Sequence, residues 1–173
     1  KTAYCIAGAA CIEDFSVGMH IERKSKLIST IFSNKTSLEG HKFRHSFAKQ
    51  VLKDKGGSSL SKVKLYGTGV LNGSADYKSS TLKDYMFHVA IENGISDTYF
   101  TEKIMDCFLT GTIPIYRGTK NISKYFDSRG IISFETMDEL KNIIENIDEK
   151  TYRKMIPYAK NNLEITKKYM YID

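Results

Sequence analysis

The sequence predicts an α/β fold: a Rossmann-like parallel sheet with helices on both faces. Along the 173 residues, short apolar segments alternate with amphipathic stretches of helical period, the order typical of parallel α/β proteins. The segment 86–91 is almost continuously apolar, as expected of a strand that is buried on both faces. Hydrophobic residues make up 41% of the chain and charged residues 27%, so a packed core is expected rather than disorder. This pattern predicts about five strands with helices between them.

The first elements lie ahead of that buried strand. Residues 26–33 are rich in Ile, Leu and Phe and predict a strand. A helix is expected over 40–53, where bulky apolar side chains recur at every fourth position. Residues 62–66 alternate apolar and polar and predict a second strand, followed by a loop with several glycines over 67–73. A short helix is expected over 79–84.

The elements that follow the buried strand continue the alternation. A polar loop over 92–98 leads into a helix predicted at 100–109. The apolar segment 112–116 predicts another strand. Pro114 lies inside it and cannot donate a backbone hydrogen bond, which indicates an edge strand or a nearby bulge. A short helix is expected over 121–126.

The C-terminal elements begin with a strand predicted at 131–134. Thr136 and Glu139 have the spacing of a capping box, in which each side chain satisfies a backbone donor at a helix N-terminus, and an apolar stripe follows them. We expect the remainder, 148–172, to be helical with an interruption at Pro157, because a proline disfavours helical geometry at the residue before it.

The charge balance favours an anionic partner. The formal net charge is +6, from 26 Lys and Arg against 20 Asp and Glu. Nucleic acid, a phosphorylated small molecule and a membrane surface all fit this balance. Nucleic acid is not expected, because the lysines are scattered and form no basic stripe with interleaved aromatic residues. Arginine binds phosphate through a fixed fork of N–H groups, so the arginines are candidates: Arg23, Arg44, Arg117, Arg129 and Arg153.

The cysteines carry little structural information. Cys5, Cys11 and Cys107 have no paired spacing, so no disulfide framework is expected. This favours a reducing compartment, and we expect a cytoplasmic location, with peripheral attachment to a membrane as the alternative. No apolar run approaches the roughly 18 residues of a membrane-spanning helix, so no transmembrane segment is expected.

Two generic motifs are incomplete. Gly67 and Gly69 follow a strand, as in a dinucleotide-binding loop, but Asn72 occupies the place of the third glycine. His41 and His45 lie four residues apart, as metal ligands can, yet the sequence offers no third ligand nearby. We expect two exposed surface histidines, no nicotinamide cofactor and no metal site. The sequence contains no Asp-x-Asp, which argues against the metal-chelating arrangement of many nucleotide-sugar enzymes.

The polar stretch after the buried strand is the strongest candidate site. Glu92 and Asn93 follow the strand, and a helix opens near Thr101 with Glu102 and Lys103 in its first turn. In open α/β sheets ligands bind beyond the carboxyl ends of the strands, and a helix N-terminus there attracts phosphate. A lysine in a first turn opposes the helix dipole unless it serves an anion. The alternative is that Lys103 points into solvent.

Arg44 is the second candidate. It adjoins Phe43 in the helix after the first strand, at the border of the apolar face. An arginine near a strand end can bind a diphosphate through its fork. The alternative is a surface arginine paired with a carboxylate.

The segment 85–118 resembles the donor-binding motif of the α1,3/4-fucosyltransferases, glycosyltransferase family 10. Four matches carry the resemblance: Glu92-Asn93, Tyr99-Phe-Thr-Glu-Lys103, Gly111-Thr-Ile-Pro114 and Gly118. Outside this segment, three more positions resemble the family: Ser33-Asn34, Arg44 and Tyr66-Gly67. The similarity covers about residues 26–145.

The resemblance implies the C-terminal, donor-binding half of a GT-B fold. Residues 1–173 would then be a single nucleotide-sugar-binding domain, with the N-terminal acceptor domain absent. The family transfers L-fucose from GDP-fucose to a hydroxyl of an acceptor glycan, with inversion and without an essential metal or other cofactor. Two alternatives stay open: a GT-B glycosyltransferase that uses another nucleotide sugar, and a non-catalytic nucleotide-sugar-binding module.

The resemblance also implies residue roles. Arg44 and Lys103 would neutralise the diphosphate during catalysis, and Glu102 would hold the ribose hydroxyls. The remaining contacts would be substrate-binding: Asn93 and Tyr99 at the diphosphate and fucose, and Ser33, Asn34 and Tyr66 near the nucleoside. The acceptor hydroxyl needs a general base, which in the family belongs to the acceptor domain.

Overall fold

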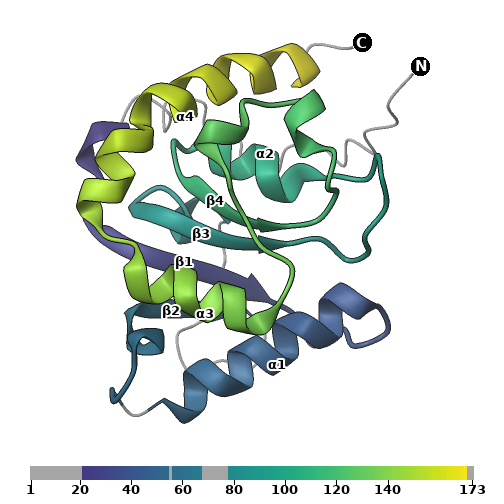
Figure 1. Ribbon diagram of the computed structural model, residues 1–173, viewed down its shortest axis with the longest axis vertical. Coiled ribbons are helices and arrows are strands. Elements are labelled where there is room, and N and C mark those ends of the chain that lie inside the picture. Colours follow the sequence, from purple (N-terminus) through teal and green to yellow (C-terminus); the bar gives the residue numbers. More distant parts are fainter. Residues whose placement is uncertain (1–20, 55, 68–77, 171–173) are drawn as a thin grey trace.

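A single parallel sheet forms the centre of the molecule. The computed structural model describes residues 21–54, 56–67 and 78–170, and the strand order within them is β2-β1-β3-β4-β5 (Figure 1). The strands are β1 (Lys26–Phe32), β2 (Val63–Gly67), β3 (Tyr85–Ile91), β4 (Ile113–Arg117) and β5 (Ile132–Ser133). Every pairing is parallel; Ile28, for example, lies opposite Val63 on one side and Phe87 on the other. The predicted parallel sheet is confirmed. Cys5, Cys11, Gly69 and Asn72 lie outside the described residues.

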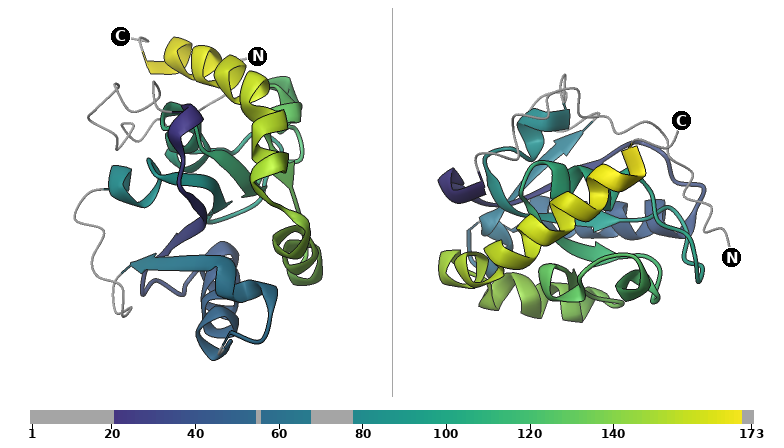
Figure 2. Two further views of the ribbon diagram at one scale, coloured as in Figure 1. Left: turned by 90° about the vertical axis from the view of Figure 1, so that its left-hand side faces the viewer. Right: turned by 90° about the horizontal axis from the view of Figure 1, so that it is seen from above.

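Helices cover both faces of the sheet, as predicted. The α-helices are α1 (Glu39–Lys53), α2 (Glu102–Leu109), α3 (Met137–Asn146) and α4 (Glu149–Met170). Helices α1 and α3 lie on one face, and α2 with the C-terminal part of α4 lies on the other (Figures 1 and 2). Short 3-10 turns are also present: residues 21–23 form one, and the others are η2 (Ser59–Lys62), η3 (Lys78–Thr81), η4 (Ile122–Lys124) and η5 (Ser128–Gly130). The short helices predicted at 79–84 and 121–126 are therefore only 3-10 turns.

Each face of the sheet has its own apolar core. On the α1 and α3 side, Phe47 and Leu140 pack with the inward-facing residues of the strands. On the α2 side, the rings of Phe100 and Phe126 meet edge to face with centroids 5.4 Å apart, and those of Phe108 and Phe126 are tilted with centroids 4.9 Å apart. Burial of these apolar side chains supplies most of the driving force for folding, and the aromatic pairs add orientation-dependent contacts.

The edge-strand prediction from Pro114 is wrong, because β4 lies between β3 and β5. Pro114 pairs with His88 of β3, whereas β5 pairs only with Ile115 and Tyr116. At Pro114 itself the strand therefore has a paired neighbour on the β3 side alone. An interior strand can contain this proline because β5 is only two residues long and does not extend to Pro114.

The predicted interruption at Pro157 is also wrong, because α4 is continuous from Glu149 to Met170. Tertiary contacts hold the helix on both sides of the proline. Before it, the Tyr152 hydroxyl lies 2.7 Å from the carbonyl oxygens of Ile21 and Gly111. After it, the Asn162 side chain bonds both the N–H and the carbonyl of Asp127. The helix changes direction along its length (Figure 1), the usual response to an interior proline.

Candidate functional site

A cavity opens at the carboxyl edge of the sheet, where ligands bind in open α/β folds. Its volume is about 220 Å³, and three segments enclose it: the loop after β1, the N-terminal half of α1, and the end of β3 with the first turn of α2. Its polar lining consists mainly of Ser33, Lys35, His41, Arg44, Asn93, Glu102 and Lys103. The cavity therefore gathers several of the residues that the sequence indicated, and most of its charged groups are cations.

A glycine allows α1 to reach this edge. The Gly40 N–H donates to the Asn93 carbonyl at 3.0 Å, which joins the first turn of α1 to the residues after β3. A Cβ atom at Gly40 would lie 1.8 Å from the Glu92 carbonyl oxygen, far inside van der Waals contact. Only a residue without a side chain fits this approach.

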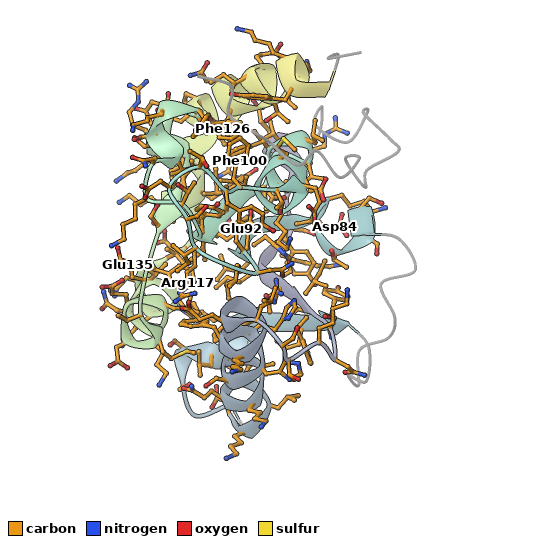
Figure 3. All side chains as sticks on the ribbon, turned by 90° about the vertical axis from the view of Figure 1, so that its right-hand side faces the viewer. Asp84, Glu92, Phe100, Arg117, Phe126 and Glu135 are labelled. Atoms are coloured by element: carbon orange, nitrogen blue, oxygen red, sulfur yellow. The ribbon has the colours of Figure 1, made fainter. Side chains whose placement is uncertain are left out.

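Arg117 fixes the same helix from the neighbouring strand. Its Nη2 donates to Glu39 Oε1 at 2.6 Å, and its Nε donates to the Glu135 carbonyl at 3.0 Å (Figure 3). Its guanidinium carbon lies 4.5 Å from the centre of the Phe43 ring. The N-terminal half of α1 is thus held by both β3 and β4, so the side chains that it presents to the cavity are well positioned.

Arg44 is held against the end of β3. It is 9% exposed, and its Nη1 donates to the Ile91 carbonyl while its Nη2 donates to Asn93 Oδ1, both at 2.6 Å. Burial lowers its pKa, and the charges of Glu92 and Glu102 raise it. The alternative of a surface arginine paired with a carboxylate is wrong, since these partners are a carbonyl and an amide.

Glu92 anchors the second cation. It is 1% exposed and accepts hydrogen bonds from the Thr101 N–H at 2.9 Å and the Thr101 hydroxyl at 2.7 Å (Figure 3). The Lys103 ammonium lies 3.4 Å from Glu92 Oε2 and 3.2 Å from Glu102 Oε1. Lys103 therefore turns into the cavity, where an ion pair holds it, and the alternative of a solvent-directed lysine is wrong.

The histidines differ from expectation. His41 is only 5% exposed and His45 is half-buried, so the prediction of two exposed surface histidines is wrong. His41 Nδ1 lies 3.3 Å from the Leu38 N–H, and His45 Nε2 lies 2.8 Å from the Ser33 carbonyl oxygen. Each imidazole satisfies a backbone group, which explains its burial. In the part of the chain that the structure describes, no group of three or more His, Cys, Asp or Glu is arranged to hold a metal ion.

The other predicted site residues lie at different distances from the cavity. Ser33 lines it, whereas Asn34 is exposed in the loop after β1. Tyr99 is half-buried, and burial together with the charges of Glu92 and Glu102 raises its pKa, so it lies within electrostatic reach. The Tyr66 hydroxyl bonds the hydroxyl of Tyr85, at the opposite end of β3 from the cavity, at 2.8 Å.

Three polar lining residues did not emerge from the sequence as ligand contacts: Lys35, His41 and His88. Lys35 belongs to the loop after β1, and His41 stands three residues before Arg44. The spacing of His41 and Arg44 was an available signal, because residues i and i+3 share one face of a helix. Lys35 had no such signal, since a loop side chain has no periodicity.

The fold and the cavity together define a Rossmann-like domain with a cationic pocket at its carboxyl edge. The chain belongs to glycosyltransferase family 10 (fucosyltransferase), since residues 21–169 match the model of that family's C-terminal part. The family resemblance predicted from the motifs is thereby confirmed.

Sequence relatives agree with this assignment. Over 75 residues the chain is 37% identical to the alpha-(1,3)-fucosyltransferase FucT of Helicobacter pylori. The aligned segment covers 43% of this chain and 15% of the relative. Over 113 residues it is 29% identical to an alpha-(1,4)-fucosyltransferase of Arabidopsis thaliana, which covers 61% of this chain and 28% of the relative. The chain thus matches only a part of these curated relatives.

Solved structures share the fold. An α1,3-fucosyltransferase with GDP-fucose superposes with a TM-score of 0.60 at 22% identity, over 87% of this chain and 48% of that one. The same kind of enzyme with GDP gives a TM-score of 0.61 at 23% identity, with the same coverage. This likeness confirms the GT-B type of α/β domain. Within the described residues, no helix is both long and apolar enough to cross a membrane.

Proposed function

We propose that this chain is the donor-binding part of a fucosyltransferase, which transfers L-fucose from GDP-fucose to a hydroxyl of an acceptor glycan. One observation carries the proposal: Arg44 from α1 and Lys103 from α2 line the same cavity beyond the end of β3. Two cations from different elements at a carboxyl edge suit a diphosphate. Family membership supports guanosine diphosphate and fucose as the particular ligand.

The proposed chemistry is charge stabilisation on the leaving group. As the bond from the anomeric carbon to the diphosphate breaks, negative charge builds on the departing GDP. Arg44, Lys103 and the N–H groups of the first turn of α2 would stabilise that charge in place. Because side chains would supply this neutralisation, we propose a reaction that needs no metal ion. We further propose that it inverts the anomeric centre, by attack of the acceptor from the opposite side.

The remaining polar groups would orient the donor. Glu102 lines the cavity, and its carboxylate can accept hydrogen bonds from the ribose hydroxyls. Asn93 and Tyr99 would contact the diphosphate and fucose, and Ser33 with Asn34 would lie near the nucleoside. Tyr66 has the weakest support of the proposed contacts, because its hydroxyl is bonded at the far end of β3.

The general base is proposed to come from outside this cavity. Activation of an acceptor hydroxyl normally uses a carboxylate. Glu92 is buried and bonded to Thr101 and Lys103, while Glu102 is assigned here to the ribose. We therefore propose that an acceptor-binding part, in the same polypeptide or in a partner, supplies both the base and the acceptor site.

Calorimetric titration with nucleotides tests this function. GDP should bind, whereas UDP and ADP should bind more weakly, and Lys103→Ala should weaken GDP binding by about tenfold or more. Lys49→Ala, at an exposed position of α1, serves as the matched control and should leave GDP binding unchanged. Equal or tighter binding of UDP or ADP would indicate another nucleotide sugar. Absence of binding at millimolar GDP would refute the proposal.

A further inference from the structure

His41 lines the donor cavity but has no part in the mechanism proposed above. It lies on α1 three residues before Arg44, so both side chains occupy one face of the helix. Its low exposure places the ring in the wall of the cavity rather than at the protein surface. The backbone bond that explains the burial of His41 uses only one of its two ring nitrogens, so the other can serve a second role beside Arg44 and Lys103.

The ring is held in one orientation. Its Nδ1 accepts a hydrogen bond from the Leu38 N–H at 3.3 Å, which satisfies a backbone donor at the N-terminus of α1. The turn that carries it is fixed in turn by the contact of Gly40 with the Asn93 carbonyl. Since Nδ1 is the acceptor, the hydrogen of the neutral ring lies on Nε2. The imidazole can therefore donate from Nε2 without giving up its bond to the helix N-terminus. The His41 side chain is hydrogen-bonded to the Asn93 side chain, so a phosphate oxygen would replace Asn93 as the acceptor.

The charges around His41 favour an anionic ligand. Arg44 on the same helix, Lys35 in the loop after β1 and Lys103 on α2 all act on the imidazole. Burial and these three cations lower the pKa of His41, while the side chain of Asn93 opposes the shift. The nearby carboxylates, Glu102 in the cavity lining and the buried Glu92, are both paired with Lys103. The neutral ring thus lies in a positive field that a diphosphate would balance.

We propose that His41 is a further binding residue for the diphosphate of the donor, donating its Nε2–H to a phosphate oxygen beside Arg44 and Lys103. This inference rests on the proposed function, and it adds a neutral donor to the two cations. A neutral N–H strengthens binding of the diphosphate without adding another permanent charge to a cavity that already holds three cations. Loss of this one hydrogen bond would lower the affinity for GDP, the leaving group.

Two substitutions separate the roles of the two ring nitrogens. His41→Asn places its Oδ1 near the position of Nδ1, so the helix cap is retained and the Nε2 donor is lost. His41→Gln carries an amide N–H near the position of Nε2 and loses the cap acceptor. Lys42→Asn is the matched control, since Lys42 is exposed on the same turn and does not line the cavity.

Calorimetry with GDP, inorganic pyrophosphate and guanosine gives the readout. We expect His41→Asn to weaken GDP and pyrophosphate by about tenfold, to leave guanosine unchanged, and to keep the wild-type melting temperature. His41→Gln should retain most of the GDP affinity with a lower melting temperature. Lys42→Asn should bind all three ligands as the wild type does.

The outcomes distinguish this inference from the function on which it rests. If the wild type binds GDP and His41→Asn binds it equally well, His41 does not contact the diphosphate and the proposed function stands. Equal weakening of guanosine and GDP would also overturn the assignment, because it would place His41 at the nucleoside. A wild-type chain that binds no GDP would refute the proposed function, and this inference with it.

Discussion

The Arg44 guanidinium and the Asn93 amide are joined by a hydrogen bond of 2.6 Å across 49 residues of sequence. The same guanidinium also bonds the carbonyl of Ile91, so the end of β3 determines where the positive charge lies. Asn93 is in turn fixed through its own carbonyl, which accepts from Gly40. The arginine thus remains in place in the absence of ligand, which reduces the entropic cost of binding a diphosphate.

Replacing Asn93 by aspartate tests this relationship. Asn93→Asp keeps the oxygen that accepts from Arg44, so the melting temperature should not fall. The added negative charge would pair with the guanidinium and repel the diphosphate, so the affinity for GDP should drop by at least about tenfold. Calorimetric titration and thermal denaturation of the same sample measure both effects. Unchanged GDP affinity would contradict the placement of the diphosphate at Arg44.

Gly40→Ala tests the close approach of α1 to β3. The new methyl group would overlap the Glu92 carbonyl, and the helix would have to shift. We expect the free energy of unfolding to fall by at least about 2 kcal/mol, with loss of GDP binding. Gly57→Ala is the control: nothing lies within 4 Å of the added atom, so denaturant unfolding should change by no more than about 0.5 kcal/mol.

The affinity for GDP should depend on pH through His41. Burial and the neighbouring cations lower the pKa of the free imidazole, whereas a bound diphosphate raises it. A group that gains basicity on binding takes up a proton, here on Nδ1 and at the expense of the bond from the Leu38 N–H, so wild-type affinity should increase relative to His41→Asn from about pH 8 to about pH 6. Titration of the nucleotide itself changes the affinity of both proteins alike, so it cancels in the ratio of wild-type affinity to His41→Asn affinity. A ratio that stays constant with pH would show that the ring does not sense the ligand.

Asp127 predicts an acid-dependent loss of stability. Hydrogen bonds from Arg129, and a weaker contribution from Asn161, lower the pKa of this carboxyl from 3.8 to about 2. The folded state therefore binds fewer protons, and the stabilisation present above pH 3.8 is lost as the pH falls towards about 2.

Urea unfolding between about pH 5 and about pH 2 measures this contribution. The difference in free energy of unfolding between wild type and Asp127→Asn should be largest at about pH 5 and vanish at about pH 2. Glu164→Gln, which removes an exposed pair with Lys167, should show a small effect at every pH. If this difference does not change with pH, the effect of Asp127→Asn does not come from the charge of the carboxyl but from its contacts with α4.

The order of the elements could be predicted from the sequence because periodicity reports local geometry. The alternating apolar segments gave the five strands, and the capping box of Thr136 and Glu139 is present at the start of α3. The two proline predictions were wrong because local preference does not include tertiary contacts. A two-residue neighbour strand accommodates Pro114, and bonds from Tyr152 and Asn162 hold α4 through Pro157.

The candidate site was predictable where a motif or a helical turn placed a residue. Arg44, Asn93, Glu102 and Lys103 do line one cavity. The burial of His41 and the anchoring role of Glu92 were not predictable, because both depend on how α1 and α2 meet the end of β3. Side-chain contacts between elements distant in sequence leave no periodic signal.

Two of the three cations of the cavity, Arg44 and Lys103, are attached to one short piece of backbone. Arg44 is bonded at Ile91 and Asn93, and Lys103 is paired with Glu92, so residues 91–93 position both charges. Movements of α1 and α2 relative to each other would therefore alter the separation of the charges only slightly. A one-residue insertion at the end of β3 would therefore change the separation of these two charges, and with it the length of the anion that the cavity accepts.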